Sequence, residues 1–137
     1  MSADGRRPHV LVINDTQEIL DLMQELLEEE GYQVTTSLAL LNMGKVKALA
    51  PDVIVQDLLF EQSQELGWKF LTLSRLDPDV APVPLILCTA AMSVVKDEDM
   101  AEKLRHLHVR VVLKPFAAEE LLDVVAAVLA ETPQASK

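Results

Sequence analysis

Cysteine is nearly absent from this chain of 137 residues, because Cys88 is its single thiol. This excludes the disulfide-stapled class of small secreted domains and favours a reducing compartment. Basic residues are also scarce, with 12 Lys and Arg against 22 Asp and Glu, for a formal net charge of −10. A nucleic-acid-binding surface and a surface that docks on anionic lipid both need clustered positive charge. We therefore expect neither nucleic acid nor membrane among the partners.

Long apolar runs are missing as well. No run approaches the ~18 residues of a membrane span. The first run, from His9 to Ile13, stops at Asn14 and is too short for the apolar region of a secretory signal. We expect a cytoplasmic protein. What the chain does have, 50% hydrophobic and 25% charged residues, is an ordinary globular composition, enough for one domain with its own core.

Short apolar runs rich in β-branched residues alternate with segments of helical periodicity. Strands are predicted at 10–13, 34–36, 53–55, 85–88 and 109–113. Helices are predicted after the capping residues 14–16 up to a stop at Gly31, at 38–50, at 68–76, from the polar stretch 96–99 to about 106, and at 119–130. This alternation is typical of βαβ units, whose right-handed crossovers place helices on both faces of a parallel sheet. We predict an α/β fold, a doubly wound five-stranded parallel sheet with five helices. The domain should span 9–131, between flexible tails at 1–8 and 132–137.

Polar residues follow the predicted strands where a doubly wound sheet carries its site, outside the carboxyl ends. Asn14 and Asp15 follow the first strand, Asp57 ends the third, Thr89 ends the fourth, and Lys114 follows the fifth. Two carboxylates with carbonyl and water oxygens suit a hard cation such as Mg²⁺. An Asp beside such a cation can attack a phosphoryl group, whose oxygens an ammonium and a hydroxyl can hold. Taken singly, Asp15 could instead cap the first helix, and Asp57 could be a simple strand-end residue.

The chain resembles the receiver domain of bacterial two-component response regulators, in its stand-alone, chemotaxis-receiver-like form. The segments that carry the resemblance are VLVIND at 10–15, PDVIVQD at 51–57, LILCTA at 85–90 and KPF at 114–116. Each motif alone is weak, but all four occur in order over roughly residues 9–130. The resemblance implies a flavodoxin-like receiver fold with strand order 2-1-3-4-5.

The resemblance also implies a role for each residue at the strand ends. Asp57 would be the phosphoacceptor, and Mg²⁺ would be held by Asp15, by Asp57 and by the backbone carbonyl of Leu59. Asn14 stands where the family has a second acidic residue, so it would reach the cation only through a water. Because ligand charge sets affinity for hard cations, we expect weak Mg²⁺ binding.

Two more positions complete the implied set. Thr89 would be the switch hydroxyl, and Lys114 would pair with the phosphoryl group. Val111 stands three residues before Lys114, where the family has an aromatic residue. A valine offers less contact energy for reporting a movement of Thr89, so we expect a muted conformational response.

The function implied is that of a stand-alone receiver rather than an enzyme, with only self-phosphorylation and self-dephosphorylation chemistry. A sensor histidine kinase or a histidine phosphotransfer protein would donate the phosphoryl group from a phosphohistidine, and a downstream protein would read the switch. The alternative is a phosphate-independent receiver-like binding or scaffold module, which Asn14 and Val111 favour. A phosphatase with an Asp nucleophile would need a second Asp at the position of Leu59.

Overall fold

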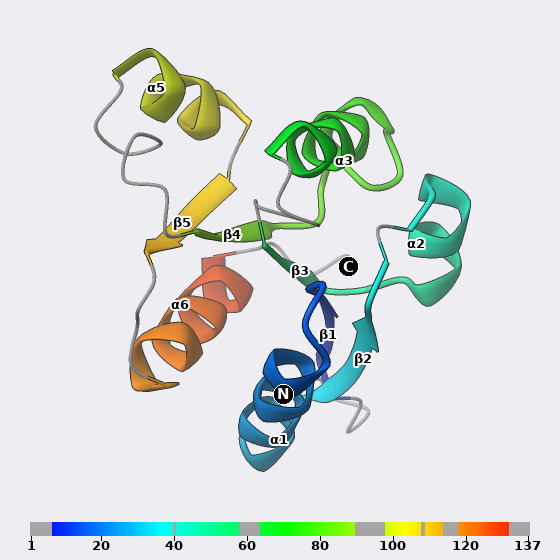
Figure 1. The fold of residues 1–137 in the computed structure, drawn as a ribbon, viewed down its shortest axis with the longest axis vertical. Helices are drawn as coiled ribbons and strands as arrows, with labels where there is room; N and C mark the ends of the chain where they lie inside the picture. Colours follow the sequence, from blue (N-terminus) through cyan, green and yellow to red (C-terminus); the bar gives the residue numbers. More distant parts are fainter. Residues whose placement is uncertain are drawn as a thin grey trace.

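A parallel sheet lies between two layers of helices (Figure 1). The computed structural model describes residues 7–39, 41–57, 64–89, 98–107, 109–113 and 118–131. The strands run in the order β2-β1-β3-β4-β5, and every neighbouring pair is parallel. This confirms the predicted fold and strand order. The strands are β1 (His9–Ile13), β2 (Gln33–Ser37), β3 (Val53–Asp57), β4 (Leu85–Thr89) and β5 (Val109–Leu113).

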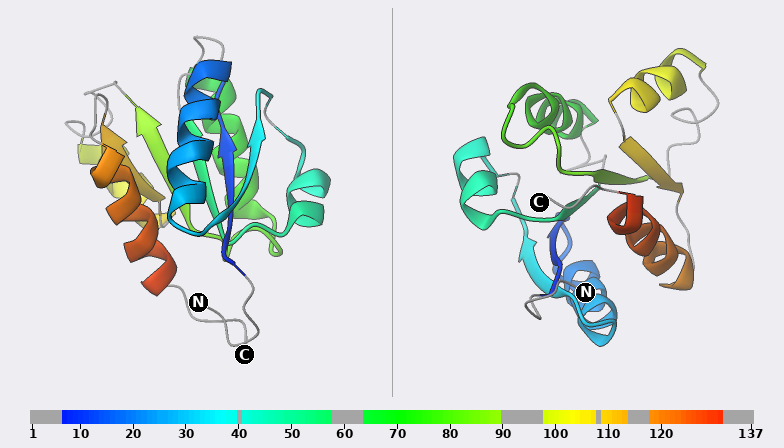
Figure 2. Two further views of the ribbon diagram at one scale, coloured as in Figure 1. Left: turned by 90° about the horizontal axis from the view of Figure 1, so that it is seen from below. Right: turned by 180° about the vertical axis from the view of Figure 1, so that it is seen from behind.

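Helices cover both faces of the sheet. They are α1 (Gln17–Glu29), α2 (Met43–Leu49), α3 (Gln64–Leu76), α5 (Glu98–His106) and α6 (Ala118–Glu131). Helices α1 and α6 pack on one face, and α2, α3 and α5 pack on the other (Figures 1 and 2). In the ranges described, no helix has both the length and the apolar content to cross a membrane. Most of the two predicted tails, residues 1–6 and 132–137, lies outside those ranges.

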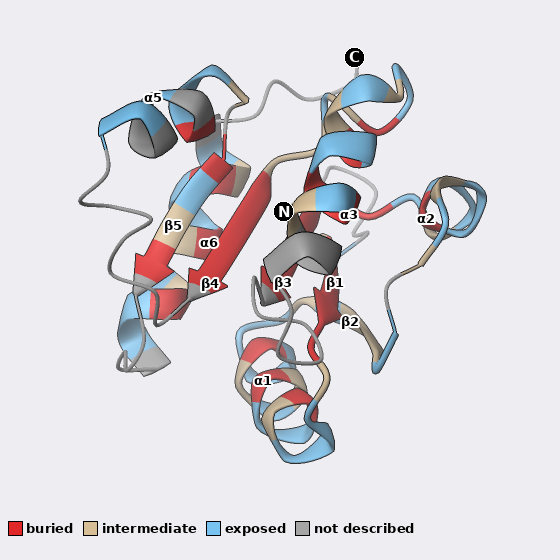
Figure 3. Ribbon diagram, turned by 45° about the horizontal axis from the view of Figure 1, so that its top comes forward, coloured by how far each residue is buried: buried red, intermediate tan, exposed pale blue. Residues whose placement is uncertain are grey.

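Two apolar cores result, one on each face, because successive strand residues point to opposite sides. In β1, Leu11 and Ile13 join the core under α2, α3 and α5, whereas Val10 and Val12 join the core under α1 and α6. The buried residues, red in Figure 3, lie along the central strands and on the sides of the helices that face the sheet. Burial on both faces explains why β1, β4 and most of β3 read as unbroken apolar runs, whereas the edge strand β2 is only partly buried. Each such side chain contributes about 1.5–3 kcal/mol to folding.

The second helix is shorter than predicted. We expected a helix over 38–50, but α2 begins at Met43, because the Asn42 side chain accepts a hydrogen bond from the backbone nitrogen of Lys45 at 2.9 Å. Helix α2 ends at Leu49, and the C-cap residue Ala50 adopts a left-handed conformation with φ 49°. The predicted start of the third helix at 68 was also wrong. Helix α3 begins at Gln64, since the helix-favouring residues there outweigh a single glycine.

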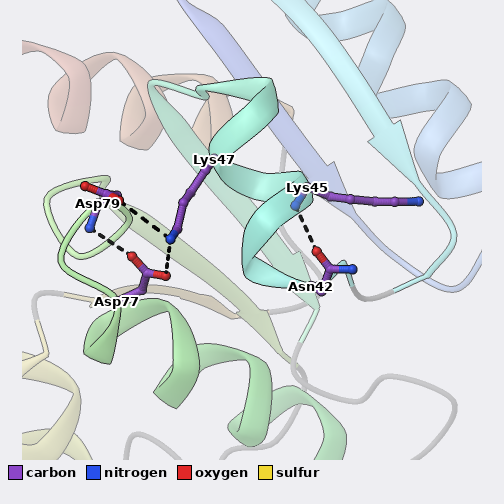
Figure 4. A network of polar contacts seen from close by, with 5 residues as sticks. All are labelled: Asn42, Lys45, Lys47, Asp77 and Asp79. Carbon is purple, nitrogen blue, oxygen red and sulfur yellow. Dashed lines mark hydrogen bonds and ion pairs between the residues drawn. The ribbon is translucent and has the colours of Figure 1, made fainter.

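Helix α2 is tied to the turn that follows α3 (Figure 4). The ammonium of Lys47 lies 2.9 Å from a carboxylate oxygen of Asp77 and 3.6 Å from one of Asp79. The contact with Asp77 raises the pKa of Lys47, and the same contact lowers the pKa of Asp77. Asp77 also accepts a hydrogen bond from the backbone nitrogen of Asp79 at 2.9 Å, which shapes the turn.

His9 fixes the amino-terminal edge of the sheet, opposite the candidate site. Its ring Nδ1 lies 3.0 Å from the carbonyl oxygen of Leu49, and Nε2 lies 2.7 Å from Oγ1 of Thr35. Its backbone nitrogen donates to the carboxylate of Asp52 at 2.7 Å. One buried side chain therefore joins β1, β2 and the end of α2. In the sequence, His9 is recognisable only as the first residue of an apolar run, so this role was not predicted.

Candidate functional site

The carboxyl ends of four adjacent strands gather the positions that the sequence singled out. In the β1–β3 pair, Ile13 lies opposite Gln56, so Asn14 follows at the level of Asp57. In the β4–β5 pair, Thr89 lies opposite Leu113, so Lys114 comes next along the chain. The backbone thus brings Asp57 and Thr89 to one edge of the sheet.

The roles of these residues stay predictions. The side chains of Asp57 and Thr89 lie outside the part of the structure that is described, as do Leu59 and Lys114 altogether. Of the predicted site residues, only Asn14 and Asp15 have described side chains.

The loop from β1 into α1 is shaped by Asn14. This residue is 2% exposed, and its backbone nitrogen donates to the carbonyl oxygen of Ser37 at 3.2 Å. Its side-chain Oδ1 accepts a hydrogen bond from the backbone nitrogen of Thr16 at 2.9 Å. An Asx turn of this kind satisfies an amide that no helical carbonyl can reach. Asn14 therefore anchors the loop that carries Asp15.

The simple capping interpretation of Asp15 is wrong. The N-cap residue of α1 is Thr16, whose own side chain makes no capping hydrogen bond. Instead, Oγ1 of Thr16 donates to Oδ1 of Asp15 at 3.3 Å. The residue Asp15 is half-buried at the carboxyl edge of the sheet, between the buried Asn14 and the exposed Thr16. Asp15 therefore lies at this edge as a half-buried carboxylate that does not cap α1.

The one carboxylate of the predicted ligand set whose side chain is described, that of Asp15, is of a type that suits a hard cation such as Mg²⁺. Asp15 supplies a carboxylate, and its partial exposure leaves room for water ligands, which Mg²⁺ keeps in most protein sites. Within the described ranges, however, no group of three or more His, Cys, Asp or Glu gathers to hold a metal. The further protein ligands that the resemblance implies, the carboxylate of Asp57 and the carbonyl of Leu59, lie outside the described part of the structure.

The buried residues just before the carboxyl ends of the central strands are apolar, with the exception of Gln56. Cys88, opposite Asp57 in the β3–β4 pair, is 1% exposed, which confirms it as a buried core residue. Gln56 is fully buried between Ile13 and Leu87 on the neighbouring strands. Gln56 was not among the predicted site residues. The available signal was a polar residue inside a run that is otherwise buried and β-branched, directly before Asp57.

The side of the sheet under α3 and α5 holds Val111 and Trp68. Both are half-buried and pack against the core that includes Phe70, Leu87 and Leu104. Val111 lies opposite Leu87 in the β4–β5 pair. Val111 stands at the position where receiver domains, the family that the sequence resembles, have an aromatic ring. The sheet therefore carries a small aliphatic side chain there, and this side chain packs against the core.

Comparison with known proteins identifies the family to which the chain is similar. The family model described as the response regulator receiver domain matches residues 10–126. Among curated relatives, hybrid signal transduction histidine kinase D of Dictyostelium discoideum is 32% identical over 117 residues, which are 85% of this chain and 7% of that protein. The DNA-binding dual master transcriptional regulator RpaA of a Synechocystis species is 30% identical over 134 residues, 95% of this chain and 54% of that protein. The chain thus spans about half or less of these relatives.

Solved structures show the same fold. The chemotaxis response regulator CheY4 of Vibrio cholerae superposes with a TM-score of 0.74 at 22% identity, covering 89% of this chain and 98% of that one. A CheY-like response regulator receiver domain protein from Methanospirillum hungatei gives a TM-score of 0.75 at 20% identity, covering 92% and 96%. The receiver domain of the Francisella response regulator 1452 gives 0.72 at 25% identity, covering 93% and 100%.

Proposed function

The chain belongs to the response regulator receiver domain family, and we propose that it acts there as a phosphorylation switch whose acceptor is Asp57. Receiver domains are signalling phosphoacceptors rather than enzymes that turn over a separate substrate. The observation that carries the proposal is the strand register, which sets Asp57 level with Asn14 and on the same edge as Thr89. Residues so distant in sequence share an edge only because the sheet is doubly wound.

The chemical step is transfer of a phosphoryl group from a phosphohistidine. A carboxylate oxygen of Asp57 attacks the phosphorus in line with the bond to be broken. The phosphorus–nitrogen bond breaks, its electron pair stays on the donor's imidazole, and that nitrogen takes up a proton. The donor would be a sensor histidine kinase or a histidine phosphotransfer protein, and a downstream protein in the cytoplasm would read the modified surface.

The predicted site residues would stabilise the transferred phosphoryl group through a bound cation and through direct hydrogen bonds. Asp15, Asp57 and the carbonyl of Leu59 would hold Mg²⁺, which, when bound, neutralises charge on the phosphoryl oxygens. The ammonium of Lys114 would add a charge-assisted hydrogen bond, and the hydroxyl of Thr89 a second one. The observation that supports the metal ligand is the half-buried Asp15, held beside Asn14 at this edge.

Incubation with a small phosphodonor and Mg²⁺, read by intact mass, tests the proposal. The unaltered chain should gain one phosphoryl group, whereas Asp57→Asn should gain none. Asp79→Asn is the matched control, because Asp79 is an exposed carboxylate on the turn after α3. It should gain one phosphoryl group, as the unaltered chain does. Equal incorporation into Asp57→Asn would refute the assignment, and no incorporation into the unaltered chain would favour a phosphate-independent binding module.

A further inference from the structure

The orientation of the Asn14 carboxamide is fixed by chemistry. The atom that lies 2.9 Å from the backbone nitrogen of Thr16 must be an acceptor, because a backbone N–H can only donate. That atom is therefore Oδ1, and the Nδ2 group occupies the other end of the carboxamide. The residue is 2% exposed, so these amide hydrogens lie within the protein rather than in bulk solvent. Asn14 thus adds donors, and no negative charge, to the interior of the carboxyl edge.

This changes the charge balance beside Asp57. A site with an acidic residue at position 14 would hold three carboxylates close together, whose mutual repulsion a cation must offset. Here the strand register brings Asp57 level with a neutral amide, which leaves Asp15 as the other carboxylate of the predicted set. An amide donor is itself a favourable neighbour for carboxylate and phosphoryl oxygens.

We propose that Asn14 is a positioning residue that keeps the site folded and ready without a bound cation. Its Oδ1 holds the loop that carries Asp15, and its neutral amide takes the place of a carboxylate whose charge a bound cation would help to balance. The inference rests on the proposed function, because the acceptor group that it serves is Asp57. It follows that the metal-free protein is the stable resting form, and that Mg²⁺ adds little to its stability.

Asn14→Asp separates charge from geometry. An aspartate can accept the hydrogen bond from Thr16 in the same Asx turn, so the loop keeps its anchor while the site gains a charge and loses two donors. Asn42→Asp is the matched control. Its side-chain Oδ1 accepts from a backbone nitrogen at the same 2.9 Å, at the exposed start of α2 (Figure 4). Both variants lower the net charge by one.

The measurements are Mg²⁺ affinity by titration calorimetry and the melting temperature in chelator and in saturating Mg²⁺. For Asn14→Asp we expect Mg²⁺ to bind about tenfold more tightly, which corresponds to about 1.4 kcal/mol. Its melting temperature in chelator should fall by about 4 °C, and saturating Mg²⁺ should restore it. Asn42→Asp should match the unaltered chain in both measurements.

A second variant, Asn14→Ala, removes the acceptor and the donors without adding charge. It should melt lower with and without Mg²⁺ alike, and its Mg²⁺ affinity should not rise. Unchanged affinity and melting temperature in Asn14→Asp would overturn the proposal. So would equal tightening in Asn42→Asp or in Asn14→Ala. None of these readouts involves phosphorylation, so a failure of the proposed function, seen as missing phosphoryl incorporation at Asp57, is distinguishable from a failure here.

Discussion

Arg75 holds the turn between α3 and β4, and its removal has a magnitude that can be worked from the contacts. One guanidinium nitrogen donates to the carbonyl oxygen of Val83 at 2.5 Å and, at the long limit of 3.4 Å, to that of Val80. Burial lowers the pKa of Arg75, whose ordinary value is high enough that it stays charged. A hydrogen bond from a charged donor contributes about 1.5–3 kcal/mol, and the longer contact adds little.

A buried polar atom of the same side chain offsets part of this stabilisation. The Nε of Arg75 is buried and makes no hydrogen bond within the described residues, which is a cost that an apolar side chain would remove. We therefore expect Arg75→Met, which keeps length and packing, to lower the free energy of unfolding by about 1.5 kcal/mol. At about 4 °C per kcal/mol for a domain of this size, the melting temperature should fall by about 6 °C.

Urea denaturation followed by circular dichroism measures this loss. Arg105→Met is the matched control, because Arg105 is exposed on α5, and its change should stay within about 0.5 kcal/mol. If the two variants proved equally stable, the carbonyl oxygens of Val80 and Val83 would not depend on Arg75, and the reasoning would be refuted.

Three further predictions concern a backbone strain, an ion pair and the lifetime of the switch. Ala50→Gly should raise the free energy of unfolding by about 0.5–1 kcal/mol in urea titrations, because the left-handed φ of 49° suits glycine. The stability advantage of the unaltered chain over Lys47→Met should shrink as the pH falls below 3.8. The reason is that the lowered pKa of Asp77 gives stability that is present above its unfolded value and lost as pH falls through its folded value. The receiver resemblance implies that the side chains two residues past Asp57 and two past Thr89, here Leu59 and Ala91, help to place the water that attacks the phosphoryl group. Neither side chain can donate or accept a hydrogen bond, so Leu59→Asn combined with Ala91→Glu should speed loss of the phosphoryl group, followed by mass.

The strands were predictable because burial on both faces leaves a strong local pattern. Val10–Ile13 and Leu85–Cys88 read as unbroken apolar runs, and helices between them imply parallel pairing. The candidate site followed from the same logic, since a polar residue that ends a buried strand of a doubly wound sheet lies at the edge where ligands bind.

What the sequence could not supply were features that depend on backbone dihedral angles and on distant partners. Leu38 to Leu41 continue the apolar pattern of α2, so the pattern concealed the start that Asn42 imposes. The choice of Thr16 over Asp15 as N-cap, and the side-chain orientation of Asn14, are set by the geometry of the β1–α1 loop. The ring of His9 contacts residues 26 and 40 positions away, which no local pattern encodes.

The most direct test of the central claim, that Asp57 accepts a phosphoryl group, is to trap the modified residue chemically. Borohydride reduces an aspartyl phosphate to homoserine, which peptide mass mapping locates to a single position. After treatment with phosphodonor and Mg²⁺, the account predicts homoserine at position 57 and at no other carboxylate. Homoserine at Asp15 or Asp52 instead, or none anywhere in the chain, would contradict it.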